Sequence, residues 1–545
     1  MGIVDRLVSI YGLRTLHEID KYRKDPVSAQ IKTFDHLLDG GCDSVFGQDH
    51  NFDDIDSFSD FRKRVPIRDY NQLKPYIDRL RKGEDYVLWN KKTSWFAKSS
   101  GTSSDKSKYI PVTNDSLYHC HYSGFQQMIF SYLNQHPKSK IFSGKSMTLG
   151  GSVQMESMSS NKNAYNGDLS AILLKNSPRL AELARTPCRQ TALIQSFEEK
   201  VEQICKECSS QNVTTFSGVP SWNFKMIQRL LEYNNVKCLT DIWPNLELFM
   251  HGGISFEPYR SQYEEIILSD NMHYIENYNA SEGYFAFQDD EKDPSMLLSL
   301  NNGVFYEFIP LSYLDDVLAG RSSVVYTIDE VRTHEQYAMV ISTNSGLWRY
   351  LIGDCVEFTS CFPHKIIITG RTQLYINAFG EELMIGNTEK ALSQACAKCN
   401  LTVSEYSVAP IFMTCNNPGG HEWVVEFSTE TCEKLGIKSA TNDVKTTTNI
   451  NSDTLPDSNI AANSVILSES ASDKIQEFAD VLDKALCSIN SDYEAKRSST
   501  INRLKLDVVS SGTFYKWMET RGKVGGQNKV PRLYKNRNFI EQLLK

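Results

Sequence analysis

Apolar side chains recur at helical spacing through several stretches in the first half of the chain. Residues 1–95 show this spacing between short polar segments, so we expect helices joined by loops there. Residues 114–137 predict one long helix, with Asn114 or Asp115 as its N-cap. Residues 190–208 predict another helix of the same amphipathic kind.

Short runs of β-branched and aromatic residues between turn residues predict β-strands. Two such runs lie among the predicted helices, at residues 145–152 and 213–222. Later the strand pattern dominates, and it predicts strands within residues 246–253, 273–288, 303–311, 323–328, 336–343, 347–358 and 364–370. Helices that alternate with strands, followed by a strand-rich half, indicate a large α/β domain with a β-barrel-like subdomain.

A smaller α+β domain is expected in the last third of the chain. There the pattern predicts a helix, a pair of strands, a second helix and a final strand. We therefore expect an N-terminal domain at residues 1–369, a hinge at 370–380 and a mobile C-terminal domain at 381–545. Residues 439–464 are polar and poor in aromatic side chains, which predicts a flexible insertion.

Length and charge narrow the class of protein. The chain has 545 residues, enough for at least two domains, and a formal net charge of −9, whereas nucleic-acid-binding proteins usually have a basic balance. No apolar stretch approaches ~18 residues, so no membrane span is expected. Asp5 and Arg6 interrupt the first apolar run, which argues against a signal peptide, and we expect a cytoplasmic protein.

The 13 cysteines are predicted to be free thiols, because their number is odd and no export signal is evident. Two CxxC pairs, Cys205 with Cys208 and Cys396 with Cys399, have a spacing that zinc ligands use. The pairs lie far apart in the sequence and each falls in a helix-like run. A structural role within helices is therefore favoured over zinc binding.

A run of small hydroxyl-bearing residues is present in AKSSGTSSDKSKYIPVT, residues 97–113. Such residues do not fill a core, but their hydroxyls and backbone N–H groups can form a concave set of donors for phosphate oxygens. Gly101 permits backbone angles that other residues avoid, and Lys106 and Lys108 add positive charge. The P-loop pattern is absent. On this segment alone, phosphate binding and a disordered serine-rich loop are equally good interpretations.

Two carboxylates and a glycine pair lie beside the predicted strands. Glu282 follows a strand in ENYNASEGYFAF, where it is either a Mg²⁺ ligand or a surface glutamate in a turn. Asp354 interrupts an apolar strand, so it needs donors, which either ribose hydroxyls or its own turn would supply. Gly252 and Gly253 end a strand in FMHGGIS, where a flat base can approach the backbone.

The order of these segments resembles that of the Gretchen Hagen (auxin-responsive) family of acyl acid–amido synthetases, in the adenylate-forming superfamily. The family pattern SSGTS…K…P is similar to Ser99–Pro111, and its Y…SE element is similar to Tyr278–Glu282. The segment Arg349–Asp354 resembles its YR…GD element, and GGQNKVPRLYKNR resembles its closing segment.

The resemblance implies a site for ATP and Mg²⁺ to which both domains contribute. Glu282 would be the Mg²⁺ ligand, Asp354 would accept the ribose hydroxyls, and Lys529 would reach the α-phosphate during adenylation. The residues implied to bind the nucleotide are Ser99, Ser100, Gly101, Thr102, Ser103, Lys108, Gly252, Gly253, Tyr278, Ser281, Asp354 and Arg371. For the acyl group we expect a pocket between two predicted helices with Phe125, Met128 and Trp222, side chains equally compatible with a core.

The implied activity is an ATP-dependent ligation in two steps. A carboxylic acid and ATP would give an acyl-adenylate and pyrophosphate, and an amine, expected to be an amino acid, would then attack the acyl carbon to release AMP. Two alternatives stay open at the level of sequence. One is an acyl–CoA ligase that forms a thioester, and the other is a nucleotide-binding scaffold without catalysis.

Overall fold

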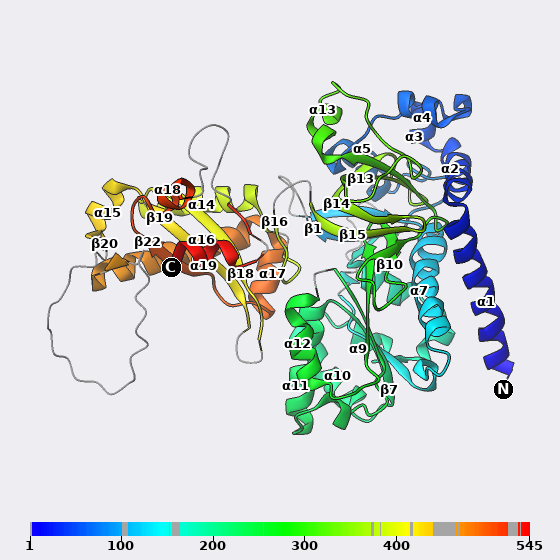
Figure 1. Cartoon of the computed structure of the whole chain (residues 1–545), viewed down its shortest axis with the longest axis horizontal. Helices are drawn as coiled ribbons and strands as arrows, with labels where there is room; N and C mark the ends of the chain where they lie inside the picture. Colours follow the sequence, from blue (N-terminus) through cyan, green and yellow to red (C-terminus); the bar gives the residue numbers. More distant parts are fainter. Residues whose placement is uncertain are drawn as a thin grey trace. The chain divides into compact units, whose positions relative to one another are not determined.

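The chain forms two compact units, one comprising residues 1–99 and 107–372 and the other extending from residue 373 to the C-terminus (Figure 1). The division falls within the stretch 370–380 that was expected to be a hinge, and motion there stays a prediction. The computed structural model describes residues 3–100, 107–151, 153–154, 164–253, 256–371, 375–381, 383–414, 418–439, 465–466, 468–520, 532–534 and 536–544.

An eleven-stranded mixed sheet runs through the first unit (Figure 1), in the order β12-β13-β14-β15-β11-β10-β9-β8-β7-β3-β6. One half is parallel: β9 (His273–Ala280), β8 (Leu248–Gly252), β7 (Val213–Gly218), β3 (Lys145–Thr148) and β6 (Arg185–Thr186). From β9 onward the other half is antiparallel: β10 (Gly283–Phe287), β11 (Met296–Leu298), β15 (His364–Arg371), β14 (Tyr350–Cys361), β13 (Gln336–Thr343) and β12 (Val304–Pro310). The predicted strand-rich half is therefore continuous with the α/β half through backbone hydrogen bonds.

Helices connect the parallel strands, as parallel pairing requires. They are α10 (Phe197–Cys208) before β7, α11 (Pro220–Asn234) between β7 and β8, and α12 (Glu257–Ile266) between β8 and β9. The α10 helix begins where the Ser196 side chain accepts a hydrogen bond from the backbone N–H of Glu199. It buries Val201, Ile204, Cys205 and Cys208 at a spacing of three or four residues, which confirms the helical interpretation of this CxxC pair.

The N-terminal segment is helical, as the sequence predicted. Its helices are α1 (Ile3–Lys24), α2 (Pro26–Cys42), α3 (Val45–Asp49), α4 (Phe58–Arg64) and α5 (Tyr70–Arg81). The α1 helix runs beside α7 (Tyr122–Gln135) (Figure 1), where the Tyr11 and Phe130 rings lie 5.9 Å apart and Tyr22 donates to Gln127 at 3.1 Å. A separate four-stranded sheet contains β2 (Ser107–Val112), β1 (Trp95–Ser100), β5 (Tyr165–Gly167) and β4 (Val153–Gln154).

The second unit is a small α+β domain with the predicted order of elements. Its three-stranded sheet contains β18 (Val403–Ile411), β19 (Gly420–Phe427) and β22 (Lys505–Val509). Its helices are α14 (Ile385–Cys399), α15 (Thr429–Leu435), α16 (Glu469–Ile489), α17 (Ser491–Ser499), α18 (Thr513–Glu519) and α19 (Asn538–Leu544). Cys396 and Cys399 lie in α14, again in a helix. Of the predicted insertion, residues 440–464 lie outside the described residues.

The helix predicted at 114–137 begins differently from the expectation. Its N-cap is Thr113, whose hydroxyl accepts from the Ser116 backbone N–H, so the prediction of Asn114 or Asp115 was wrong by one or two residues. A π-helical segment at Leu117–His121 then precedes α7. Such wide turns are rare and frequently occur at functional sites.

Two other predicted elements need correction. The helix expected at 190–208 is interrupted, with a short α9 (Arg189–Ala192) and a new start at α10, because the Ser196 cap favours a break. Residues 323–328 form no strand despite their β-branched residues. Their ladder contact is one isolated antiparallel bridge between Tyr326 and Phe308, on the edge of β12 that β13 leaves free.

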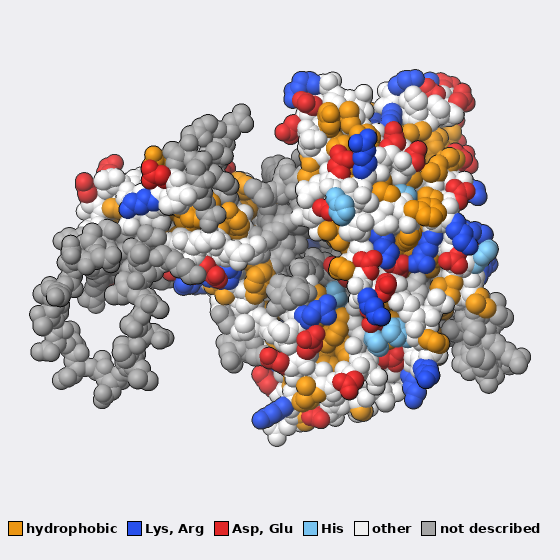
Figure 2. All heavy atoms as spheres, viewed as in Figure 1, with side chains coloured by type: hydrophobic (Ala, Val, Ile, Leu, Met, Phe, Trp, Pro, Cys, Tyr) orange, Lys and Arg blue, Asp and Glu red, His pale blue; other side chains and the backbone are white. Residues whose placement is uncertain are grey.

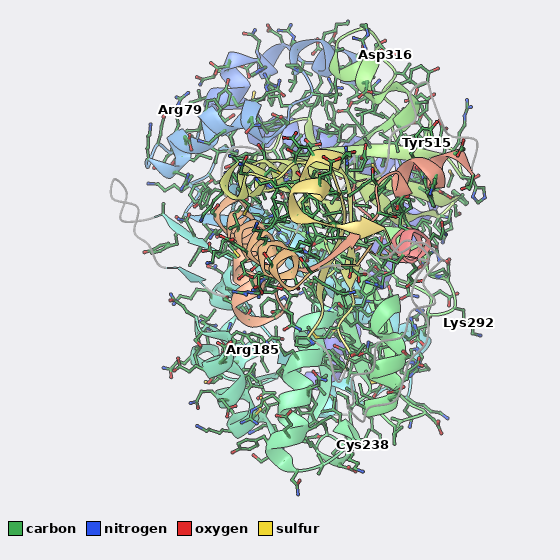
Figure 3. The ribbon with its side chains drawn as sticks, turned by 90° about the vertical axis from the view of Figure 1, so that its left-hand side faces the viewer. Arg79, Arg185, Cys238, Lys292, Asp316 and Tyr515 are labelled. Carbon is green, nitrogen blue, oxygen red and sulfur yellow. The ribbon has the colours of Figure 1, made fainter. Side chains whose placement is uncertain are left out.

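The cysteines of the described ranges agree with the prediction of free thiols, and charges of both signs are mixed on the surface. Lysines and arginines are interspersed with acidic residues over the face of the first unit in Figure 2. Exposed charges also pair locally, as Arg79 with Glu84 and Arg321 with Asp316 (Figure 3). All 12 cysteines in the described ranges are free. Within the same ranges, the helices fall short of the length and apolarity needed to cross a bilayer.

Candidate functional site

Two residues that are distant in the sheet order meet through a hydrogen bond. The Tyr278 hydroxyl on β9 donates to Oδ2 of Asp354 on β14. Three strands separate β9 from β14 in the ladder, so this contact requires the sheet to curl toward itself here. Both side chains are buried, at 6% and 7% exposed, and a buried carboxylate needs such donors. The structure thus brings together two of the residues that the sequence predicted.

The predicted Ser–Glu pair forms the tight turn that joins β9 to β10. Ala280 pairs with Gly283 across this hairpin, which leaves Ser281 and Glu282 as the two turn residues. Glu282 is 7% exposed, which argues against the alternative of a surface glutamate in a turn. A carboxylate is thereby held at the end of β9, four residues beyond the hydrogen-bond donor Tyr278.

The glycine pair ends β8 directly beside β9. Gly252 pairs with Asn277, and a Cβ atom at Gly252 would collide with the Asn277 carbonyl oxygen, so only glycine fits there. Gly253 has a φ of +83°, which also favours glycine. The Asn277 amide donates to the His251 carbonyl at 2.9 Å and fixes the two strand ends together. Ligands in α/β sheets bind at the carboxyl ends of parallel strands, which is where Gly252 and Glu282 lie.

His121 is a further polar residue at this end of β9, and the sequence analysis did not identify it. Its Nδ1 lies 2.8 Å from Oδ1 of Asn279, between Tyr278 and the Ser–Glu turn. Burial lowers the pKa of His121 to about 4, so the imidazole is neutral at physiological pH. The π-helical segment ends at His121. Such wide turns mark functional sites in structures but have no pattern in the sequence, so His121 could not be predicted from the sequence.

The segment Arg349–Asp354 contains a buried ion pair. Arg349 contacts Glu307 twice, with Nε 2.8 Å from Oε2 and Nη2 2.9 Å from Oε1, and its Nη1 donates to the Val65 carbonyl at 2.8 Å. The backbone of Arg349 has a φ of +44°, a strained value for a residue with a side chain. Arg349 therefore anchors the strand that carries Asp354 rather than facing a ligand.

The serine-rich segment is described only at its ends. Ser99 and Ser100 are the last residues of β1, and Lys108 is a buried residue of β2. The predicted Gly101, Thr102 and Ser103 lie outside the described residues, and so does Lys529 of the second unit. Arg371 ends β15 opposite Asp354 in the β14–β15 ladder, which places its backbone beside the Tyr278–Asp354 pair.

The three residues expected at an acyl pocket occupy different environments. Phe125 is exposed on α7, while Met128 lies in the core, where its sulfur accepts from the Tyr284 hydroxyl at 3.5 Å. Trp222 on α11 packs edge-on against Phe197, with ring centroids 4.6 Å apart. Met128 therefore fits the core interpretation that was left open beside the acyl one.

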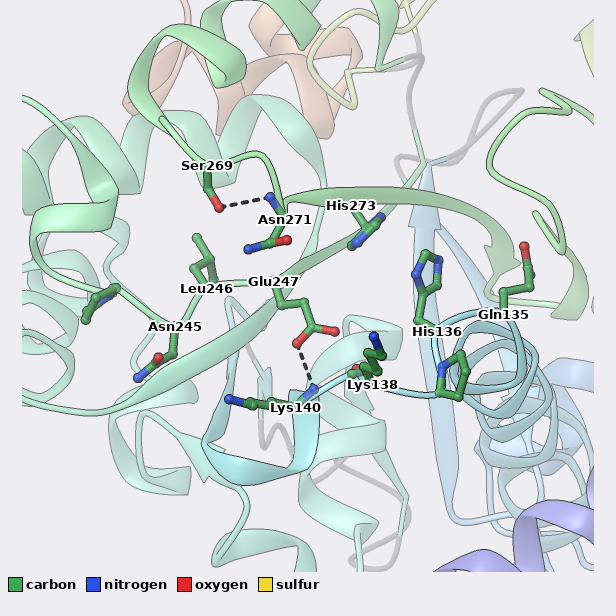
Figure 4. A pocket seen from close by; sticks show the side chains of 13 residues that line it. Gln135, His136, Lys138, Lys140, Asn245, Leu246, Glu247, Ser269, Asn271 and His273 are labelled. Atoms are coloured by element: carbon green, nitrogen blue, oxygen red, sulfur yellow. Dashed lines mark hydrogen bonds between the residues drawn. The ribbon is translucent and has the colours of Figure 1, made fainter.

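A cavity of 530 Å³ lies at the opposite end of β8 and β9 from Gly252 and Glu282 (Figure 4). It is lined by residues 135–140, 244–247, 269, 271 and 273, and by none of the predicted site residues. Its strand residues precede β8 or begin β9, whereas the candidate site is at the ends of the same two strands. The cavity is thus a separate feature.

Three family models match consecutive parts of the chain. They are the GH3 family N-terminal domain at residues 15–272, the central domain at 297–371 and the C-terminal domain at 386–538. The chain belongs to the GH3 family. The central-domain match covers β12 to β15 and hence Asp354, and the C-terminal match falls within the second unit.

Two curated relatives indicate how far this GH3 chain has diverged. It is 22% identical to the jasmonoyl–L-amino acid synthetase JAR6 of Nicotiana attenuata, over 97% of this chain and 95% of the relative. It is also 22% identical to the indole-3-acetic acid-amido synthetase GH3.2 of Arabidopsis thaliana, over 66% of this chain and 76% of the relative.

Solved structures share the fold of the GH3 chain. The GH3.15 acyl acid amido synthetase superimposes with a TM-score of 0.57 at 16% identity, covering 97% of this chain and 95% of the other. The 2-hydroxyisobutyryl-CoA ligase superimposes with a TM-score of 0.51 at 12% identity, covering 100% of this chain and 93% of the other. The expected fold, a large α/β domain followed by a small α+β domain, is therefore confirmed.

Proposed function

We propose that this GH3 protein is an ATP-dependent acyl acid–amido synthetase. It activates a carboxylic acid as an acyl-adenylate and then transfers the acyl group to an amine, which we propose is an amino acid. Support comes from the three family matches and from the relatives whose names describe amide synthesis from acyl acids.

The Tyr278–Asp354 hydrogen bond is the observation that carries this proposal. It positions a buried carboxylate at the carboxyl end of the parallel strands, where nucleotides bind in open α/β sheets. We propose that Asp354 accepts the ribose hydroxyls of ATP and that Tyr278 holds its carboxylate in place. Gly252 and Gly253 leave room for adenine, because no side chain projects from the end of β8.

Glu282 fits the requirement of a Mg²⁺ ligand, because Mg²⁺ prefers carboxylate oxygens and this carboxylate is held in a tight turn at the same strand end. When bound, the ion would neutralise charge on the ATP phosphates. We further propose that Lys108 contributes positive charge to the same phosphates. Adenylation builds up negative charge around the α-phosphate, so cations placed there lower the barrier more than they stabilise the bound substrate.

The first step forms the bond between a carboxylate oxygen of the acid and the α-phosphorus of ATP, and pyrophosphate leaves. In the second step the amine nitrogen attacks the acyl carbon, loses a proton and displaces AMP. We place this activity in the cytoplasm, where thiols stay reduced, because the cysteines of the described ranges are free.

The test measures pyrophosphate exchange into ATP for a panel of aromatic, fatty and keto acids, followed by product analysis with amino acids or CoA. We expect acid-dependent exchange and an amide product. Asp354→Asn and Glu282→Gln should each reduce exchange by at least 10²-fold, a loss typical of groups that stabilise a transition-state charge. The matched control is Asp316→Asn, an exposed carboxylate paired with Arg321, which should retain full exchange.

Each rival function has its own outcome in this experiment. A thioester with CoA and no amide would establish the acyl–CoA ligase. ATP binding without exchange for any acid of the panel would establish the non-catalytic scaffold. Equal exchange in Asp354→Asn and in the control would refute the assigned site while leaving the amide-forming reaction intact.

A further inference from the structure

Three potential metal ligands meet at the end of the sheet opposite the candidate site. His136 directly follows α7, His273 is the first residue of β9, and Glu291 lies in the loop between β10 and β11. One ligand atom from each of these residues lies within 4.8 Å of the other two. Three segments far apart in the sequence thus contribute one donor each. All three side chains are 22–29% exposed, so an ion can reach them from solvent.

The ligand atoms lie close together, and Oε1 of Glu291 is the one carboxylate oxygen of the group without a hydrogen bond in the described ranges. Oε1 of Glu291 lies 2.9 Å from Nε2 of His136 and 2.9 Å from Nδ1 of His273. Neither approach has hydrogen-bond angles, and within the described ranges Oε1 accepts no hydrogen bond. His273 instead contacts Oε2 at 2.9 Å. A carboxylate oxygen that faces two imidazole nitrogens off their N–H directions is suited to a shared cation.

The spacing needs only a small adjustment to hold an ion. Tetrahedral ligands with metal bonds of about 2.0 Å lie about 3.3 Å apart, so the two contacts to Oε1 would lengthen by about 0.4 Å. The backbone of both histidines is held by hydrogen bonds, so the longer distances to Oε1 would come from rotation of the side chains. The His273 backbone N–H donates to the Glu247 carbonyl at 2.8 Å, and the His136 N–H donates to the Tyr132 carbonyl at 2.9 Å.

The open side of the cluster faces the 530 Å³ cavity. Figure 4 shows the two imidazoles side by side at one end of it, and their ring centroids are 4.2 Å apart. Glu247 on the cavity wall accepts from the Tyr132 hydroxyl and from the Lys140 backbone N–H, both at 2.8 Å. The wall is therefore polar and ordered, and a water molecule there has room to complete the coordination of an ion.

We propose that His136, His273 and Glu291 form a binding site for one divalent transition-metal ion of the Zn²⁺ class. Two imidazoles and one carboxylate suit Zn²⁺ and its neighbours in the first row, whereas Mg²⁺ and Ca²⁺ prefer oxygen ligands alone. The ion ties the end of α7, the start of β9 and the β10–β11 loop together. Because His273 and Tyr278 are at different ends of β9, this site is distinct from the Mg²⁺ site proposed for ATP.

Without an ion, His273 and Glu291 hydrogen-bond to each other, and an ion has to displace this contact. Hydrogen bonding to Glu291 raises the pKa of His273, which retains its proton more strongly than a free imidazole. Burial opposes ionisation of Glu291, but the two histidines outweigh it and lower its pKa. Glu291 therefore supplies a negative charge to the cluster.

The test uses the full chain after dialysis against a chelator, titrated with Zn²⁺ and with Co²⁺ as a coloured substitute. We expect one equivalent of Co²⁺ to give visible bands without the thiolate charge-transfer absorption that cysteine ligands produce. Saturating Zn²⁺, at about 100 times its Kd, should raise Tm by about 3–4 °C. His136→Asn, His273→Asn and Glu291→Gln should each weaken binding at least 100-fold.

Two matched controls separate the site from its surroundings. Lys292→Gln changes the exposed neighbour of Glu291, which points away from the molecule in Figure 3, and should leave binding unchanged. His334→Asn removes a more exposed histidine that also faces a carboxylate, with Nδ1 3.4 Å from Oε1 of Glu357, and this variant should also bind the ion normally. Glu291→Gln keeps the size of the side chain, so a normal Tm without ion will show that this variant folds.

The proposal is overturned if dialysed protein binds no Co²⁺ or Zn²⁺ above micromolar background. It is equally overturned if Glu291→Gln, folded and with a normal Tm, binds the ion as tightly as the unsubstituted chain. Bands from thiolate ligation would assign the ion to cysteines and would also refute it. None of these outcomes bears on pyrophosphate exchange, because the cluster shares no residue with the ATP site.

Discussion

Replacing Tyr278 by phenylalanine isolates the contact on which the proposed ATP site depends. The substitution keeps the ring, which packs against Phe285 with a centroid distance of 4.9 Å, and removes only the hydroxyl. Asp354 then loses a donor while it stays buried. No cavity larger than one oxygen atom is created, so the measured effect reports the hydrogen bond and not lost packing.

The expected cost follows from the charge and burial of the acceptor. A hydrogen bond to a charged group contributes about 1.5–3 kcal/mol, and the site is more than nine-tenths buried, which favours the upper part of this range. We expect a loss of about 2–3 kcal/mol in unfolding free energy. For a unit of this size this corresponds to a fall in Tm of about 3–4 °C. If Asp354 binds ribose, its misplacement should also raise the KM for ATP about tenfold.

The assay compares three tyrosine–aspartate pairs by thermal unfolding. Tyr76→Phe is the exposed control, because its hydroxyl donates to Asp49 at 2.8 Å near the surface, and it should cost under 1 kcal/mol. Tyr493→Phe is the buried control in the second unit, where the hydroxyl donates to Asp483 at 2.7 Å. Equal effects of Tyr278→Phe and Tyr76→Phe would refute the reasoning. A normal KM with lowered stability would leave the contact structural only.

Three further substitutions test other features of the same region. The pKa of His121, about 4, lies below its value in the unfolded chain, so the free energy of unfolding falls as the pH falls from about 6.5 toward 4. Between pH 7 and pH 5, the unsubstituted chain should lose about 2 kcal/mol more of this free energy than His121→Gln, as measured by denaturant unfolding. Gly252→Ala forces β8 away from β9 and should weaken ATP binding at least tenfold by calorimetry, whereas Gly386→Ala, with open space around it, should not. Glu307→Gln leaves the Arg349 guanidinium buried without its carboxylate and should cost about 3–5 kcal/mol, and a loss below 1 kcal/mol would contradict the ion pair's role.

Elements with a long periodic pattern were predictable from the sequence, and local exceptions were not. The apolar spacing in α10 identified a helix because its buried face repeats over three turns. Residues 323–328 have the composition of a strand, but only Tyr326 pairs with the free edge of β12, and how far a segment follows such an edge depends on its tertiary contacts. Thr113, one residue before the predicted Asn114, is the N-cap because its hydroxyl alone accepts the hydrogen bond from the Ser116 backbone N–H that starts the helix.

The candidate site shows the same division. Glu282 and Gly252 could be identified because a turn and a close strand approach leave traces in a few consecutive residues. His121 could not be, because its importance comes from Asn279, more than 150 residues away, and from a π-helical turn without a sequence signature. Met128 has the composition of an acyl-pocket residue but faces Tyr284 in the core.

The position of β9 in the sheet explains why both proposed sites lie at its ends. This strand is the switch between the parallel and antiparallel halves of the sheet, so it is the last strand whose carboxyl end is shared with β8 and the first that turns back through a hairpin. A hairpin at a parallel strand end projects its turn residues beyond the sheet, which is how Glu282 comes to lie beside the end of β8. At its other end, β9 begins next to α7, and His273 meets His136 there for the same topological reason. A change of register in β9 by one residue would reverse the faces of His273 and Tyr278 together, and would therefore abolish both clusters at once.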